Sequence, residues 1–329
     1  MKPDNPVHLL NGDAAEAALR ETGIPGMRFV WREIYTAGPL AADWRALWRT
    51  ERRMAWLETR YGIPRGDFVR ESFVRGGVWA TAMALHAPLA VWADPDLFDQ
   101  TIFMAVCWGL VQEEATKPGQ TLLLVRLPAG SLDALAMRAA WSRREAVTPA
   151  AIGAAARAWG AYVSGEPAAV RDWLERDGEA QGLSALANAL RFHLLRFPGE
   201  DGLGIVERET LLALDEAAEE QAGQESKRPG AGLTALALFG RVAPRVPLFG
   251  LGDLQYWRCL ERLAESDPPL VRVMTASGAA RALPPRLPRL HDDIAMCEAL
   301  RYQLTSAGRE VLDGVRVAPS GTTECGISG

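Results

Sequence analysis

The N-terminal third of the chain alternates short apolar runs with helical patterns, and each apolar run ends in a polar cluster. Residues 7–10 lead into Asn11-Gly12-Asp13, residues 28–30 into Trp31-Arg32-Glu33, and residues 89–92 into Asp94-Pro95-Asp96. A strand, a helix and a second strand in succession predict a right-handed crossover and a parallel strand pair. Because the carboxyl ends of parallel strands meet at one edge of an open sheet, these polar clusters should converge there. The pattern predicts an α/β domain with a ligand site at that edge.

The remaining pattern divides the chain into further parts. We expect an α/β domain over residues 1–128 with a helical insertion at 41–86, a helical middle region at 129–200, a winged-helix-like unit at 201–314 and a disordered tail at 315–329. Periodic apolar residues predict the helices, and short helices followed by two strands suggest the winged-helix outline. The fold class is therefore α/β, a small open parallel sheet of Rossmann-like type, followed by a helical region and the winged-helix-like unit.

Composition and charge exclude several classes of protein. The chain is 48% hydrophobic and 23% charged, which is typical of a globular protein, and its net charge of −5 argues against binding nucleic acid or anionic membranes through bulk charge. No apolar run approaches a membrane span, and the N-terminus does not resemble a signal peptide. None of the four cysteines lies in a CxxC pair. We expect a cytoplasmic protein without a zinc site.

The first polar cluster follows the first expected strand. Gly12 allows the backbone to approach a ligand, and the free N–H groups at the start of the next helix favour anions. Asp13 works against a phosphate at this point and better suits a ribose hydroxyl, an amine or a metal. The alternative is that Asp13 caps the helix over 14–21 and that Gly12 only permits a tight turn.

A second cluster of carboxylates follows the third expected strand. Asp94, Asp96 and Asp99 lie within six residues, and Gln100 adds an amide. Such a cluster can bind a cation or take part in acid–base chemistry, and crowding would raise at least one pKa. The alternative is that Asp94 or Asp96 caps the following helix while the other carboxylates are solvated.

Arginines near the second expected strand suggest an anion site. Arg32 and Glu33 end the strand. The helix predicted over 43–61 carries further arginines, of which the first three share one face: Arg45, Arg49, Arg52 and Arg53. Together these arginines can form an anion clamp. The alternative is a solvated helix face whose charge is balanced by glutamates.

The C-terminal part suggests a different type of function. A winged helix would place its recognition helix at residues 254–263, where Arg258 and Arg262 could contact DNA. Winged helices also serve as protein-interaction or packing modules, and the fold alone does not decide between these roles.

These residues together resemble a bacterial family known as domain of unknown function 1835. Its members are similar to this chain at 8–13 (HLLNGD), Trp31-Arg32-Glu33, Gly38-Pro39 and Asp96-Leu97-Phe98-Asp99-Gln100, and the resemblance extends over roughly residues 7–314. Related sequences tend to carry Glu-His-Asp where this chain has Asp94-Pro95-Asp96. The resemblance implies no established activity and supports the position of the site.

The first hypothesis is therefore a small polar or nucleotide-like ligand at the strand edge. Its expected contacts are Asn11, Gly12, Asp13, Arg32, Glu33, Asp96, Asp99 and Gln100. The second hypothesis is a regulator or interaction protein that binds DNA or a protein partner through the winged helix. The sequence assigns no cofactor and no catalytic residue, so an enzymatic role stays open.

Overall fold

The computed structural model describes residues 5–114, 119–127, 132–180, 182–222, 232–275, 277–280, 287–290 and 292–322. The chain forms two compact units. Of the described residues, the first unit comprises those up to Trp56 and those within Pro64–Arg191, and the second comprises Leu57–Ile63 and those from Phe192 onward. This division differs from the expected one, because the helices over 132–191 belong to the same unit as the sheet.

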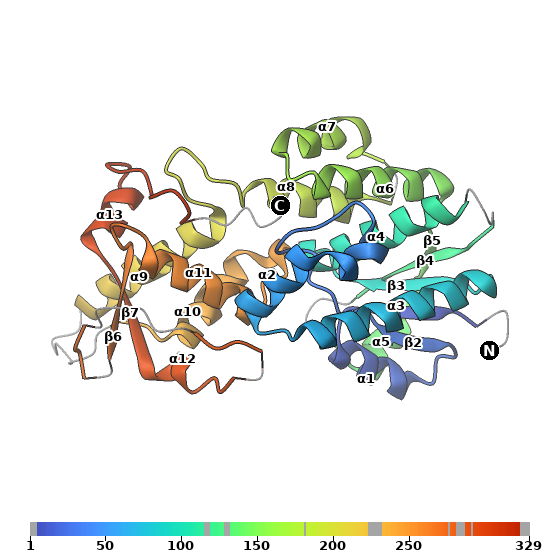
Figure 1. Ribbon diagram of the computed structural model, residues 1–329, viewed down its shortest axis with the longest axis horizontal. Coiled ribbons are helices and arrows are strands. Elements are labelled where there is room, and N and C mark those ends of the chain that lie inside the picture. The colour runs from blue at the N-terminus through green and yellow to red at the C-terminus, as the bar shows by residue number, and fades with distance from the viewer. Residues whose placement is uncertain are drawn as a thin grey trace. The chain divides into compact units, whose positions relative to one another are not determined.

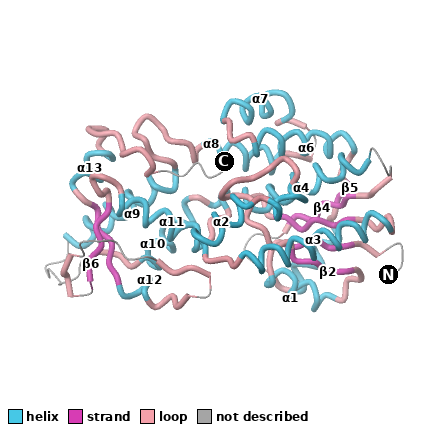
Figure 2. Tube along the Cα trace, viewed as in Figure 1, coloured by secondary structure: helices cyan, strands magenta, loops and turns pink. Residues whose placement is uncertain are grey.

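A five-stranded sheet forms the centre of the first unit, and Figure 2 shows its strands in magenta. The strands are β1 (Val7–Leu10), β2 (Met27–Val30), β3 (Leu89–Ala93), β4 (Leu122–Arg126) and β5 (Glu145–Ala146). Their order is β2-β1-β3-β4-β5; the first four are parallel and β5 is antiparallel to β4. The α/β prediction is confirmed. The two-residue β5 is too short for periodicity to reveal.

Helices cover both faces of this sheet (Figure 1). The helical elements between residues 13 and 194 are α1 (Asp13–Thr22), η1 (Trp44–Arg49), α2 (Glu51–Tyr61), α3 (Arg65–Ala84), α4 (Leu97–Glu114), α5 (Ala134–Ser142), α6 (Pro149–Val163), α7 (Pro167–Asp177) and α8 (Ser184–Leu194). Leu10, Trp92 and Val125 form one core cluster with α1 and α5. Leu124 and Phe103 of α4 line the same small hollow, and because neighbours on a strand alternate in direction, α4 covers the opposite face.

The predicted helix over 43–61 is interrupted. Residues Trp44–Arg49 form a 3₁₀ helix, and α2 starts at Glu51 after the extended Thr50. Trp44 is buried and its indole donates a hydrogen bond to the Ala105 carbonyl oxygen, at 2.7 Å. This tertiary contact fixes the first turn separately from the second helix.

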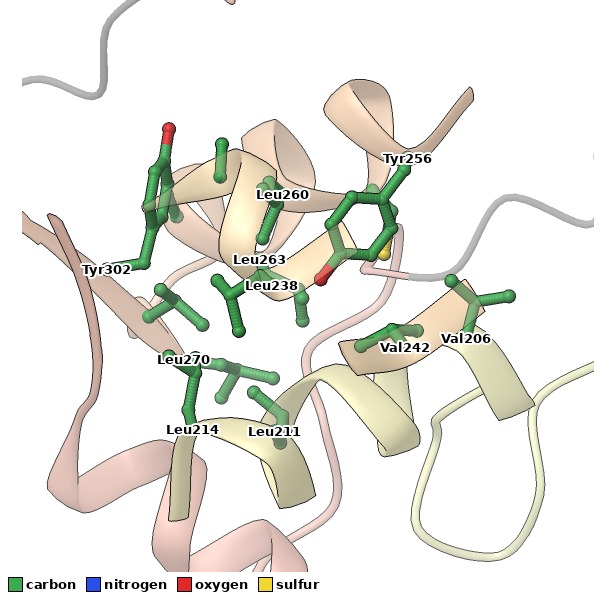
Figure 3. Packing of buried hydrophobic residues seen from close by; sticks show 14 of the residues in the cluster. Val206, Leu211, Leu214, Leu238, Val242, Tyr256, Leu260, Leu263, Leu270 and Tyr302 are labelled. Atoms are coloured by element: carbon green, nitrogen blue, oxygen red, sulfur yellow. The ribbon is translucent and has the colours of Figure 1, made fainter. Parts of the chain in front are cut away.

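The second unit has its own hydrophobic core. Its elements are α9 (Ile205–Ala222), α10 (Ala235–Val242), η2 (Ala243–Arg245), η3 (Pro247–Phe249), α11 (Asp253–Glu265), β6 (Val271–Thr275), α12 (Met296–Ala299), β7 (Leu300–Leu304) and α13 (Ser306–Leu312). β6 and β7 are antiparallel, and Leu233 forms an isolated antiparallel bridge with Tyr302. Figure 3 shows Leu211, Leu238 and Leu260 packed together from α9, α10 and α11.

The C-terminal segment is only in part as expected. The amide of Ala318 donates a hydrogen bond to the Asp201 carbonyl oxygen, at 2.8 Å, and Thr322 is buried. Ala318 and Thr322 are thus packed, whereas Val315 and Val317 are exposed, and the expected disorder over 315–329 stays a prediction. Residues 323–329 lie outside the described part of the chain. No helix in that described part is long and apolar enough to cross a membrane.

Candidate functional site

The strand order creates a topological switch point between β1 and β3. The chain leaves β1 for α1 on one face of the sheet and leaves β3 for α4 on the other face. In open α/β sheets, ligands bind at the carboxyl ends of the strands where the connections diverge in this way. Asn11 follows β1 and Asp94 follows β3, so the two sequence clusters meet at this point.

Asp99 joins the ends of these two strands. Its Oδ2 accepts a hydrogen bond from Nδ2 of Asn11, at 3.0 Å, and another from the backbone amide of Asp94, at 2.6 Å. The side chain lies in the first turn of α4 and the residue is 1% exposed. Its other oxygen, Oδ1, is buried without a hydrogen-bond partner among the described residues. We call Asn11, Asp94, Asp96 and Asp99 the switch-point cluster.

Asp96 and Gln100 have structural partners. Oδ1 of Asp96 accepts the backbone N–H of Asp99 at 2.9 Å, so Asp96 caps α4. The side-chain amide of Gln100 donates to the Asp94 carbonyl oxygen at 2.7 Å, and Gln100 is buried. Gln100 therefore holds the end of β3, which corrects the expectation that it contacts a ligand.

The carboxyl of Asp94 differs in its hydrogen bonding from the carboxyls of Asp96 and Asp99. It is half-buried, and no described residue donates a hydrogen bond to it. Burial, with the nearby Asp96 charge as a second cause, raises the pKa of Asp94 to about 6. Burial also raises the pKa of Asp96. For Asp99, burial and the nearby Asp96 charge together hold the pKa well above its usual range. Asp94 thus has a carboxyl without a donor among the described residues, and this carboxyl titrates at a pKa of about 6.

The start of α1 lies next to Asn11. Gly12 is the N-cap of α1 and provides no side-chain hydrogen bond, whereas Asp13 is the first helical residue. The prediction that Asp13 caps the helix is therefore wrong. Asp13 is exposed and forms an ion pair with Arg32, whose Nη1 lies 3.7 Å from Oε2 of Glu71. The first turn of α1 thus keeps backbone N–H groups without a side-chain acceptor.

Glu33 does not face solvent. Its side chain is 2% exposed and lies between Arg53, at 2.6 Å, and Arg75, at 3.3 Å. Burial alone would raise the pKa of Glu33, but the two guanidinium groups outweigh burial and lower it. The expectation that Glu33 contacts a ligand is corrected, because this carboxylate is fully engaged inside the protein.

The arginines of the expected anion clamp have other partners. Arg45 pairs with Asp43 at 3.1 Å and with Glu113 at 2.9 Å, and the Arg49 guanidinium lies 5.0 Å from the centre of the Trp48 ring. These contacts engage the side chains locally and do not support a shared anion site.

Arg258 and Arg262 are held inside the second unit. Arg258 is 1% exposed; it donates to the Pro288 carbonyl oxygen at 2.8 Å and lies 2.9 Å from Glu261. Arg262 pairs with Glu207 at 3.3 Å and donates to the carbonyl oxygen of Thr322. The expected DNA contact at Arg258 is wrong, because helical periodicity cannot show that a later segment of the chain covers the helix.

A hollow of about 280 Å³ lies elsewhere in the first unit. Its walls include Leu110, Thr121, Leu122, Val147 and Ile152. Since β4 begins at Leu122, this hollow lies at the amino end of that strand and not at the predicted edge. Within the described ranges, no three His, Cys, Asp or Glu residues are placed to hold a metal ion.

No protein-family model matches this chain, and no curated protein matches it. The resemblance to domain of unknown function 1835 thus stays a prediction, and the case for a function comes from the geometry of the switch-point cluster.

Proposed function

We propose that the first unit binds a small polar ligand at the switch point between β1 and β3. The observation that carries this proposal is the carboxyl of Asp94. It follows β3 at the position where open α/β sheets bind ligands, and no described residue donates a hydrogen bond to it. A half-buried carboxyl with a raised pKa is costly to the fold, and such groups are enriched at functional sites.

The groups around Asp94 support recognition of a polar molecule. The side-chain oxygen of Asn11 accepts no hydrogen bond from the described residues, and its amide already binds Asp99. Backbone N–H groups of α1 lie directly after Asn11. Arg32, which is 49% exposed in its side chain, and Asp13 form a pair beyond these groups. Binding is the activity that we propose; no residue here is assigned a catalytic step.

A thermal-shift screen of the full chain tests this proposal. The library contains nucleosides, nucleotides, amino acids, amines, sugar phosphates and Mg²⁺, because the ligand is unidentified. A compound at about 100 times its dissociation constant should stabilise the protein by roughly 2.7 kcal/mol. The stabilisation should vanish in Asp94→Asn and persist in Asp172→Asn, which removes the same charge from the exposed face of α7. Compounds that stabilise wild type and Asp94→Asn equally would contradict the proposed position.

For the second unit, we propose a winged-helix-like module that acts in packing or protein contact. The order of α9, the bridge at Leu233, α10, α11, β6 and β7 supports this reading. The internal partners of Arg258 favour a structural role for α11 over DNA binding. A pull-down from cell extract that recovers duplex DNA through this unit would contradict it.

A further inference from the structure

We propose that protonation of His8 releases α5 from the sheet of the first unit at acidic pH. His8 lies in the middle of β1, which pairs with β2 on one side and with β3 on the other. Its imidazole is buried on the face of the sheet that α5 covers, beside Trp92 of β3 and Trp141 of α5. This response to pH goes beyond the proposed ligand binding and does not depend on it.

Two hydrogen bonds fix the protonation state of the imidazole. Nδ1 of His8 lies 3.1 Å from Nε1 of Trp92, and Nε2 lies 3.1 Å from the Pro25 carbonyl oxygen. An indole N–H can only donate and a carbonyl oxygen can only accept, so Nε2 carries the proton and Nδ1 carries none. A second proton, on Nδ1, would point at the Trp92 N–H, and that hydrogen bond would be lost.

The uncharged groups around the imidazole enclose it closely. The Trp141 ring lies edge-on to it, with 5.0 Å between the ring centres, and stacks on Trp92. On the opposite side, a Cβ added to Gly26 would lie 2.6 Å from Nε2, so the backbone leaves no space there. Burial lowers the pKa of His8 and outweighs the hydrogen bond to Pro25, which raises it.

Charged side chains on the neighbouring elements do not stabilise a protonated ring. Arg28 of β2 lies opposite His8 in the register, and its positive charge also lowers the pKa of His8. Among the described residues, no carboxylate forms an ion pair with His8. The other charged residues of α1, of α5 and of the positions flanking α5 are exposed or, like Glu16, paired: Asp13, Glu16, Arg20, Glu21, Asp133, Arg138, Arg143 and Arg144.

A folded core that resists protonation loses stability in acid. The imidazole takes up a proton near pH 6.5 when water surrounds it, whereas His8 in the core does so at a lower pH. Below this value the open state binds more protons, so its population rises as the pH falls. α5 is the element that must leave, because its Met137, Ala140 and Trp141 pack on this face of the sheet.

Hydrogen exchange of the full chain at about pH 7.5 and about pH 5.5 tests this response. Protection factors of the α5 amides are compared between the wild type and His8→Gln, which keeps a donor and an acceptor and takes up no proton. The ratio of protection at the lower to that at the higher pH should be several-fold, and at most about tenfold, smaller in the wild type. The switch-point carboxyls also have raised pKa values, but both proteins contain them, so their effect cancels.

A second variant tests the hydrogen bond itself. Trp92→Phe removes the N–H that faces Nδ1 and keeps an aromatic ring, so folded His8 should take up a proton at a higher pH than in the wild type. The matched control is Trp173→Phe, which removes another buried indole donor, bonded to the Ala154 carbonyl oxygen at 2.8 Å. Ring ¹⁵N shifts of His8 report both the tautomer and the titration, and the signal missing from His8→Gln identifies them.

Three results would overturn the inference. A proton on Nδ1 at about pH 7.5 would contradict the two hydrogen bonds. Titration of His8 near pH 6.5 with unchanged protection of α5 would show that the core accepts the charge. An equal pH response of α5 in the wild type and in His8→Gln would assign the acid sensitivity to another group. Should His8→Gln fail to fold, titration of His8 at the same pH in Trp92→Phe and in the wild type would refute the inference.

Discussion

At the scale of single residues, the carboxyls of the switch-point cluster differ in their hydrogen bonds: those of Asp96 and Asp99 hold the local backbone, whereas that of Asp94 accepts no hydrogen bond from the described residues. Asp99 has two internal donors on one oxygen, and Asp96 accepts the amide that it caps. Asp94 has no donor to its carboxyl among the described residues, although all three carboxyls carry a desolvation penalty. A chain under selection for stability alone would replace such a residue, so its cost is consistent with a role in binding.

The raised pKa of Asp94 predicts a change of stability with pH. Folded Asp94 holds its proton up to a pH of about 6, whereas the unfolded group loses it near 3.8. The folded state therefore binds more protons between these values, and stability falls as the pH rises through this window. Asp94→Asn removes this effect. It should raise the unfolding temperature at about pH 7.5 and change it little at about pH 4.

Thermal unfolding of both proteins across this range checks the prediction. The groups that act on Asp94 are Asp96 and, through the shared hydrogen bond, Asp99, and both remain in the variant. An equal effect of Asp94→Asn at both pH values would contradict the raised pKa and would weaken the case for a costly, functional carboxyl.

At the scale of elements, the long connection after β2 is irregular yet buried. Residues 31–39 include the buried Trp31, Glu33 and Tyr35 and lie outside the strands and helices; the Trp31 amide still donates to the Leu10 carbonyl oxygen of β1, but carbonyl oxygens further along the segment need another donor. Arg53 from α2 takes this role: it donates to the carbonyl oxygens of Ala37, Pro39 and Ile34 and pairs with Glu33. Hydrogen bonds from the buried Arg53 thus stand in for the strand or helix hydrogen bonds that this segment lacks.

Removal of Arg53 should destabilise the first unit strongly. Arg53→Met would leave Glu33 with Arg75 as its remaining cation and would leave several buried carbonyl groups without donors. Breaking a buried pair from one side costs about 3–5 kcal/mol. The double variant Arg53→Met with Glu33→Gln should recover part of this loss. Chemical denaturation measures the unfolding free energy of the single and the double variant. A loss under about 1 kcal/mol in Arg53→Met would contradict the stabilising role of Arg53.

The strands and helices could be predicted from the sequence more readily than the side-chain contacts between them. Strands β1 to β4 and helices α1 and α4 follow from apolar periodicity and turn residues, because their signals are local. The roles of Glu33, Arg53 and Arg75 could not be predicted, since they depend on contacts between residues 20 and 42 positions apart. The convergence of Asn11 with Asp94 and Asp99 was predictable from the order of strands and helices alone.

At the scale of the whole molecule, net charge and internal pairing argue against nucleic-acid binding. The chain carries a net charge of −5, and Arg258 and Arg262 are engaged with Glu261, Glu207 and backbone carbonyl oxygens. Phosphate contacts would require these side chains to leave their partners, and a buried Glu261 would then lose a cation.

Arg258→Ala should therefore lower stability and leave DNA binding unchanged. The expected loss is on the order of 3 kcal/mol, because Glu261 and the carbonyl oxygens of Leu287 and Pro288 lose a buried donor. Fluorescence anisotropy with a labelled duplex at low salt should show no specific binding for either protein. Binding by the wild type that weakens steeply with salt and is lost in Arg258→Ala would contradict this account.

The central claim is that a ligand binds at the switch point between β1 and β3. The most direct measurement is the two-dimensional ¹⁵N–¹H spectrum of the full chain with any compound that stabilises it. The account predicts that the Asp94 backbone amide and the Asn11 side-chain amide shift, because both belong to the hydrogen-bond pair on Asp99. Shifts confined to residues around Leu122 and Ile152 would place the ligand in the hollow at the other end of the sheet and would contradict the account.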